Sequence, residues 1–152
     1  MSIRDHVLNA ITDFELLLNS LEKREGSKVG GSFRSRCREL PALIEDVGLV
    51  PALSYCYAKA GKGVYDTIKR MLKEGGKISD GDSTEKGYGI YLYFTLKRLK
   101  DLKLLEESHL DDPIKAFEEL QKGKQRVASK LLSPYLIQMK RLSEAIFKAE
   151  GE

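Results

Sequence analysis

The chain has 152 residues, of which 41% are hydrophobic and 32% charged, so it can bury one core and does not have the composition of a disordered chain. No stretch approaches the roughly 18 apolar residues that span a bilayer, and the N-terminus lacks the apolar segment of a signal peptide. We therefore expect a soluble cytoplasmic protein without membrane contact. The net charge of +3 is mild, so only the distribution of basic residues bears on binding partners.

The first predicted helix follows an apolar stripe. Hydrophobic side chains recur from residue 3 to residue 21 at alternating spacings of four and three, which is the period of one helix face. Gly26 is expected to end this helix, because glycine adopts the left-handed conformation that stops helices. Gly30 and Gly31 then read as a flexible joint.

A second helix is expected after this joint. Ser32 is predicted to cap it, since a serine hydroxyl accepts hydrogen bonds from the first amides of a helix. An apolar stripe runs from Phe33 to Val47, and Gly48 closes the element. Pro41 is expected to kink or break the helix, because proline removes one backbone hydrogen bond.

The remaining elements follow the same periodicity. Residues 75–87 have no apolar period and many turn-forming residues, which predicts the main surface loop. Pro134 is expected to bend or start the last helix. The other predicted helices cover residues 49–60, 64–73, 88–105, 113–122 and 128–149. Asp112 and Pro113 are expected to open the helix at 113–122. With no β-hairpin or internal repeat, the sequence predicts an all-α single-domain bundle of about six or seven helices over residues 1–152.

The residues that usually carry catalysis or bind metals are not grouped by the sequence. Cys37 and Cys56 stand apart on apolar faces, where a buried structural role is usual. His6 and His109 occur in polar contexts without a nucleophile or acidic partner, so we expect both in solvent. Asp80 lacks the glycine and glutamate of a calcium loop at the required spacing. We therefore expect no enzyme activity, no cofactor and no metal site.

Basic residues are concentrated in two places. Lys28, Arg34, Arg36 and Arg38 lie around and after the glycine pair, and the final helix carries a further set: Lys130, Lys140 and Arg141. Such residues either bind phosphate, helped by the positive end of a helix, or form an ordinary solvated helix surface. The residues alone leave both interpretations open.

Two stretches resemble a known family. "FRSRCRELPALIEDVGLVPALSYCYAKAG" shows basic residues before Leu-Pro, an amphipathic segment and a buried Ala-Leu helix, and "ASKLLSPYLIQMKRLSEAIF" is similar to a C-terminal helix with Lys-Arg and Glu-Ala. Together they resemble the small α-helical subunit of the type III-B (Cmr) CRISPR effector complex, which serves antiviral defence.

The resemblance implies a non-catalytic subunit of a ribonucleoprotein. Copies of it stack weakly along the complex backbone beside the other Cmr subunits, and the isolated chain is a monomer. Basic residues line the groove that holds guide RNA and target RNA, and they contact phosphates without reading sequence. An RNA-binding role is thereby implied for Lys28, Arg34, Arg36, Arg38, Lys130, Lys140 and Arg141. The alternative is a helical adaptor that uses its basic faces to bind acidic protein partners.

Overall fold

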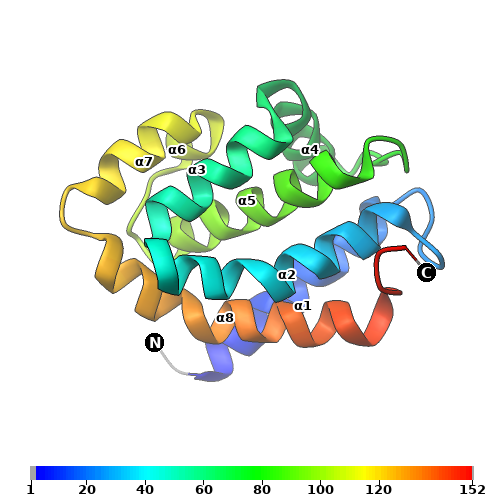
Figure 1. The fold of residues 1–152 in the computed structure, drawn as a ribbon, viewed down its shortest axis with the longest axis horizontal. Helices are drawn as coiled ribbons and strands as arrows, with labels where there is room; N and C mark the ends of the chain where they lie inside the picture. Colours follow the sequence, from blue (N-terminus) through cyan, green and yellow to red (C-terminus); the bar gives the residue numbers. More distant parts are fainter. Residues whose placement is uncertain (1–2, 152) are drawn as a thin grey trace.

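The computed structural model describes residues 3–151, and within that range the chain folds into eight α-helices (Figure 1). The only β-type pairing in this range is an isolated bridge between Leu21 and Ile78. The predicted all-α bundle is confirmed, and the helix number is close to the expected six or seven. The helices are α1 (Ile3–Ser20), α2 (Lys28–Val47), α3 (Leu49–Ala60), α4 (Lys62–Glu74), α5 (Ser83–Asp101), α6 (Glu107–Asp111), α7 (Pro113–Gln121) and α8 (Gln125–Ile146).

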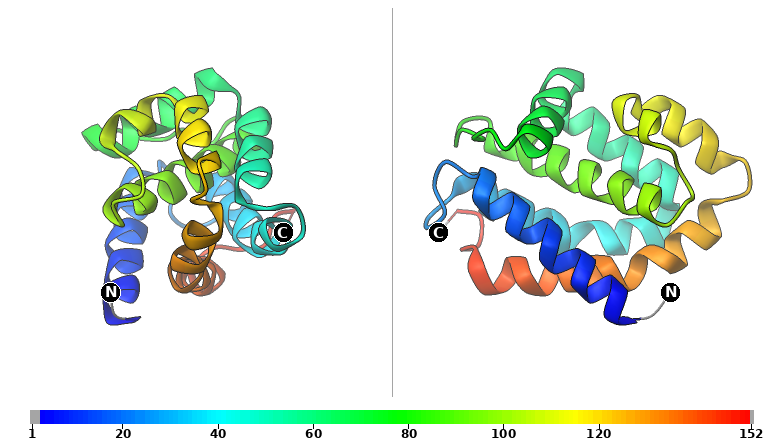
Figure 2. Two further views of the ribbon diagram at one scale, coloured as in Figure 1. Left: turned by 90° about the vertical axis from the view of Figure 1, so that its left-hand side faces the viewer. Right: turned by 180° about the vertical axis from the view of Figure 1, so that it is seen from behind.

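Helix α5 lies at the centre of the bundle. Every residue from 86 to 96 is buried, so this helix is covered on all sides and not on one stripe. Helices α2, α3 and α4 pack on it, while α1 and α8 pack on each other below α2 in the view of Figure 1. Seen from behind, α1 runs obliquely across α8 (Figure 2). The buried side chains form one continuous core.

Helix α2 begins earlier than the sequence predicted. Its cap is Ser27, whose hydroxyl accepts a hydrogen bond from the Gly30 amide at 2.9 Å, and Ser32 lies inside the helix. The Gly30-Gly31 pair is buried in the first turn and is not a flexible joint. Its small size leaves room for the C-terminal segment, because a Cβ on Gly30 would collide with the ring of Phe147.

The two helix prolines do not interrupt their helices. Pro41 lies inside α2, which continues to Val47, and Gly48 ends it as predicted, with its amide donating to the Ile44 carbonyl at 2.9 Å. Pro134 lies well inside α8 and does not start it. Packing along α2 and α8 therefore outweighs the loss of single backbone hydrogen bonds.

The predicted loop at residues 75–87 is shorter than expected. Helix α5 already starts at Ser83, and Lys86 and Gly87 are buried. The Lys86 ammonium donates to the backbone oxygen and the hydroxyl of Ser79 at 2.9 and 2.8 Å. This polar segment therefore contains the buried first turn of α5. Its residues are buried because α2 and the loop itself supply their contacts. Sequence periodicity cannot register such contacts.

We predict that Gly87→Ala destabilises the fold, because a Cβ there would lie 2.7 Å from Ser32 Cβ and 2.9 Å from the Ser32 carbonyl carbon. Backbone atoms cannot rotate away, so the expected loss in the free energy of unfolding is about 1–3 kcal/mol. Chemical denaturation measures it. The control is Gly63→Ala in α4, where nothing lies within 4 Å of the added atom and alanine should stabilise the helix slightly. Equal stability of the two variants would contradict the proposed contact.

Candidate nucleic-acid interface

The predicted basic residues lie on two helices that are neighbours in space. Helices α2 and α8 run side by side and antiparallel (Figure 1). The start of α2 faces the end of α8, because Gly30 lies against Phe147 and Cys37 lies near Ser143. This pairing brings together basic residues that are about a hundred positions apart in the sequence.

Arg34 and Arg38 lie one turn apart on the flank of α2. Lys140 lies one turn before Ser143 on α8, close to the level of Arg38, and Arg141 follows it. Arg38 and Arg141 are exposed, whereas Arg34 and Lys140 are half-buried. We call these four residues the basic face.

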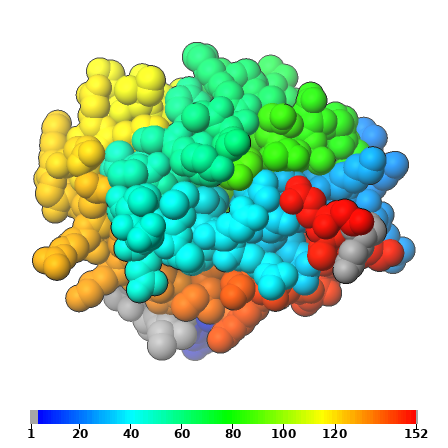
Figure 3. Space-filling view, viewed as in Figure 1, coloured from blue at the N-terminus to red at the C-terminus, as the bar shows by residue number. Residues whose placement is uncertain are grey.

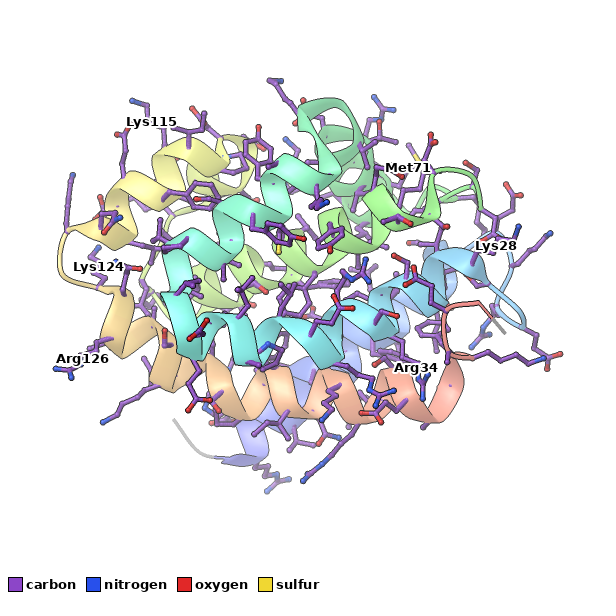
Figure 4. The ribbon with its side chains drawn as sticks, in the orientation of Figure 1. Lys28, Arg34, Met71, Lys115, Lys124 and Arg126 are labelled. Atoms are coloured by element: carbon purple, nitrogen blue, oxygen red, sulfur yellow. The ribbon has the colours of Figure 1, made fainter. Side chains whose placement is uncertain are left out.

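The basic face has little internal neutralisation. Within residues 3–151, Arg34, Arg38 and Arg141 have no carboxylate within ion-pair distance, and the Lys140 ammonium has only Glu144 at 4.0 Å. The Nε of Arg34 is buried and lacks a hydrogen-bond partner in the same range. Figure 4 shows Arg34 beside the C-terminal part of α8. Cations without acidic neighbours are available for an external anion.

Arg36 has a different environment. It is only 5% exposed, and its guanidinium carbon lies 4.3 Å from the centre of the Tyr88 ring. Its Nη2 lies 3.3 Å from a carboxylate oxygen of Glu39 and 3.3 Å from one of Glu150. Arg36 therefore points toward α5 and does not share the flank of α2 that carries Arg34.

The positive end of α2 is already occupied. The amides of Lys28 and Val29 donate to one carboxylate oxygen of Asp80 at 2.9 and 3.2 Å, and Ser27 holds the Gly30 amide. The protein's own carboxylate thus stands where an external phosphate would bind a helix terminus. The side chain of Lys28 remains exposed beside this end of the helix (Figure 4).

Lys130 lies in a third environment. It borders a groove of about 760 Å³ between the end of α2, the start of α3 and α8. Apolar side chains such as Ile44, Leu136 and Ile137 line the groove, and Arg126 and Lys130 stand on its α8 side. Arg126 lies at the opposite end of α8 from Arg34 (Figure 4). The structure therefore gathers four of the seven predicted residues and separates Lys28, Arg36 and Lys130 from them.

A buried polar network joins α1 to α5 and α8. The Tyr135 hydroxyl donates to Asp13 at 2.6 Å, and the Lys97 ammonium donates to the other oxygen of Asp13 at 2.9 Å. Next to it, Arg98 donates to Nδ1 of His6 at 2.8 Å. The prediction that His6 is solvated is therefore wrong, because its partner lies 92 positions away. These contacts join helices within the bundle, which is a structural role.

Both cysteines are buried, as predicted. Burial raises the pKa of the Cys56 thiol to about 12 and also raises the pKa of the Cys37 thiol, so both stay protonated near neutral pH. His109 is partly buried, and its Nδ1 accepts from the Glu106 amide at 2.9 Å at the start of α6. Residues 3–151 contain no group of three or more His, Cys, Asp or Glu suited to a metal, and no helix there is long and apolar enough to cross a membrane.

The His6 contact predicts a pH-dependent stability. Burial, and then the charge of Arg98, lower the pKa of His6 below its ordinary value of 6.5, while Asp5 acts weakly in the opposite direction. The His6 side chain therefore binds a proton more readily in the unfolded chain than in the folded chain. The contribution of neutral His6 is complete above pH 6.5 and is lost as the pH falls below that value.

The variant for this test is His6→Asn, because the amide oxygen keeps an acceptor for Arg98 and does not titrate. We expect denaturation midpoints of the native chain to fall more than those of the variant when the pH drops about one unit below the ordinary histidine pKa. Parallel losses in both proteins would show that other groups cause the pH dependence.

Comparison with known proteins places the chain in a class of CRISPR-associated proteins. A family model described as CRISPR-associated protein (Cas_Cmr5) matches residues 13–146. The chain belongs to this Cas_Cmr5 family, which confirms the resemblance found in the sequence. One curated relative is the CRISPR system CMR subunit Cmr5 of Saccharolobus solfataricus, which is 30% identical over 146 residues, with 91% of each chain covered.

Two solved structures have the same fold. A chain in the cryo-EM structure of type III-B Cmr-beta bound to cognate target RNA and AMPPnP superposes with a TM-score of 0.83 and 23% identity, covering 97% of this chain and 99% of that one. A chain in the type III-B Cmr-beta complex bound to non-cognate target RNA gives a TM-score of 0.82 and 24% identity, with 95% and 97% covered. These similarities extend over nearly the whole length of each chain.

Proposed function

We propose that the chain is the non-catalytic small subunit of a type III-B Cmr complex and that its basic face contacts the RNA held there. Family membership and the Cmr subunit name of the Saccharolobus relative support the first part. The structural relatives belong to complexes bound to target RNA, which supports RNA as the partner. In such complexes base pairing reads sequence, so a subunit beside the duplex needs only shape and positive charge.

One observation carries the RNA contact, namely the antiparallel pairing of α2 and α8. It brings Arg34 and Arg38 of α2 beside the C-terminal half of α8, which carries Lys140 and the exposed Arg141. Of these four residues, only Lys140 has a carboxylate within ion-pair distance among residues 3–151, that of Glu144 at 4.0 Å. A row of cations binds successive phosphates and releases their counterions, which favours binding at low salt. Guide RNA and target RNA are equivalent for such contacts, because the phosphates carry no sequence information.

Lys28, Arg36 and Lys130 lie outside the basic face, and we propose a different role for each. Lys28 is exposed at the start of α2, apart from the basic face, and is available there for a separate phosphate contact. Lys130 borders an apolar groove, which favours contact with a neighbouring protein subunit and keeps the adaptor alternative for that end of α8. Arg36 is held by carboxylates, so it reaches RNA only if one of them is displaced.

We predict that Arg34→Ala combined with Arg38→Ala weakens retention of target RNA by the assembled complex. Each lost phosphate contact should reduce the slope of log affinity against log salt by about one, without changing sequence preference. RNA binding measured at several salt concentrations tests this. Lys140→Ala combined with Arg141→Ala should act in the same direction.

The matched control is Arg70→Ala combined with Lys115→Ala, which removes the same charge from exposed positions on α4 and α7. Lys115 lies far from Arg34 in Figure 4. If the control lowers RNA retention as much as the basic-face variants, total charge is the cause and the assignment is wrong.

Self-association should be weak. The exposed apolar residues include Leu8 and Ile11 on α1, and Val47 and Ile137, which line the groove at α2 and α8. Apolar residues on different helices allow copies to stack head to tail, and the backbone of the complex raises their effective concentration.

We therefore predict that the isolated chain is a monomer at micromolar concentration, because stacked copies are aligned by the complex and need little affinity for each other. Sedimentation velocity measures the state directly. A dimer that persists at nanomolar concentration would contradict this expectation and would indicate a self-contained assembly.

A further inference from the structure

The segment after α8 folds back over the start of α2. Phe147 is buried, and its ring centre lies 5.5 Å from that of Phe14, which anchors the end of α8 in the core. Residues 148–151, which we call the C-terminal strap, then lie across the first turns of α2 (Figures 1 and 3). An added Cβ on Gly31 would lie only 3.0 Å from the Lys148 carbonyl oxygen, so the glycine allows this approach.

The strap is held mainly at one point. The last backbone hydrogen bond of α8 runs from the Phe147 amide to the Ser143 carbonyl at 2.9 Å. In the described part of the strap, Glu150 forms an ion pair with Arg36 at 3.3 Å. The Glu150 side chain is 40% exposed, and a partly exposed ion pair contributes little stability. The strap can therefore lift while Phe147 stays in place.

Beneath the strap lies a site suited to an anion. Arg36 is nearly buried on the Tyr88 ring, and its Nε is buried without a hydrogen-bond partner in residues 3–151. A separate hollow of about 480 Å³ lies between the strap and the starts of α2 and α5. Lys28, Lys148 and Glu150 line it, whereas Arg36 does not. A guanidinium binds carboxylate and phosphate oxygens through the same pair of donors. Glu150 therefore occupies a position that a phosphate can take.

We propose that Glu150 competes with an RNA phosphate for Arg36, so that binding of RNA along α2 displaces the C-terminal strap. This inference rests on the proposed function, since it assumes that RNA reaches the basic face. It assigns Arg36 a role despite its burial, because the displaced carboxylate uncovers the guanidinium. The phosphate gains the Nη2 that Glu150 leaves and the unpartnered Nε, while Glu39 remains on the helix.

The first test measures binding of a labelled oligouridylate to the chain of residues 1–152 by fluorescence anisotropy. Glu150→Gln keeps the shape of the side chain and removes its charge, so RNA affinity should rise about two- to fivefold and the salt slope should steepen by about one. Glu118→Gln on α7 is the matched control, because it makes the same charge change at an exposed residue paired with Lys115 at 3.6 Å.

A double-mutant cycle tests whether the increase in RNA affinity caused by Glu150→Gln depends on Arg36. Glu150→Gln introduced into an Arg36→Gln background should give no more than the small effect of Glu118→Gln. Circular dichroism melting of each variant shows that it is folded. A gain that persists without Arg36 would overturn the competition.

Displacement of the strap is measured separately, by tryptophan fluorescence. The chain contains no tryptophan, so Ala149→Trp provides a single reporter on the strap. Its emission should shift to longer wavelength as RNA saturates the protein, because the displaced indole enters solvent.

The failures of the two proposals are distinguishable. If Glu150→Gln behaves like Glu118→Gln and the reporter is unchanged while the Arg34 and Arg38 variant still loses RNA, the competition is wrong and the RNA contact stands. If no variant binds RNA alone and the Arg34 and Arg38 variant retains it normally in the complex, both proposals are wrong.

Discussion

The packing of α2 against α5 decides which arginines of α2 reach solvent. Gly87 allows the two helices to approach at Ser32, and this contact fixes the rotation of α2 about its axis. Arg36 is then turned toward Tyr88 on the α5 side. Arg34 and Arg38 lie on the flank beside α8, because each is two positions from Arg36 and successive helix residues point in different directions. One close helix contact thus separates a buried arginine from two that are available to an external anion.

The electrostatics of the start of α2 follow from the same placement. Segments from distant parts of the chain bring carboxylates to this helix end, with Asp80 on its amides and Glu150 on Arg36. The notable concentration of base in the sequence is therefore partly neutralised within the fold. The basic residues beside the contact between α2 and α8 have no comparable partners within residues 3–151, so they remain available to an external anion.

The sequence predicted the helices because their apolar stripes depend only on local spacing. It failed where a distant segment supplies the partner. Gly30 and Gly31 resemble a joint until the C-terminal segment is placed on them, and His6 resembles a solvated residue until Arg98 is placed beside it. For the candidate site, the sequence identified the basic residues and their helices. It could not pair α2 with α8 or assign Arg36 to the α5 side, because both depend on contacts across the bundle.

Asp80 and Glu150 illustrate why one carboxylate is structural while the other is displaceable. Asp80 accepts hydrogen bonds from two backbone amides and lies in a loop that is fixed on both sides. On one side the Ile78 amide donates to the Ser20 carbonyl at 2.7 Å, and on the other side α5 begins. Glu150 contacts one side-chain nitrogen and lies three residues after Phe147, which is buried against Phe14. A phosphate that competes with Asp80 would have to move the loop and uncap α2, whereas one that competes with Glu150 has only to replace a single partly exposed ion pair. Of the two carboxylates, Glu150 is therefore the easier one for an external anion to replace, while Asp80 keeps the helix terminus of α2 occupied.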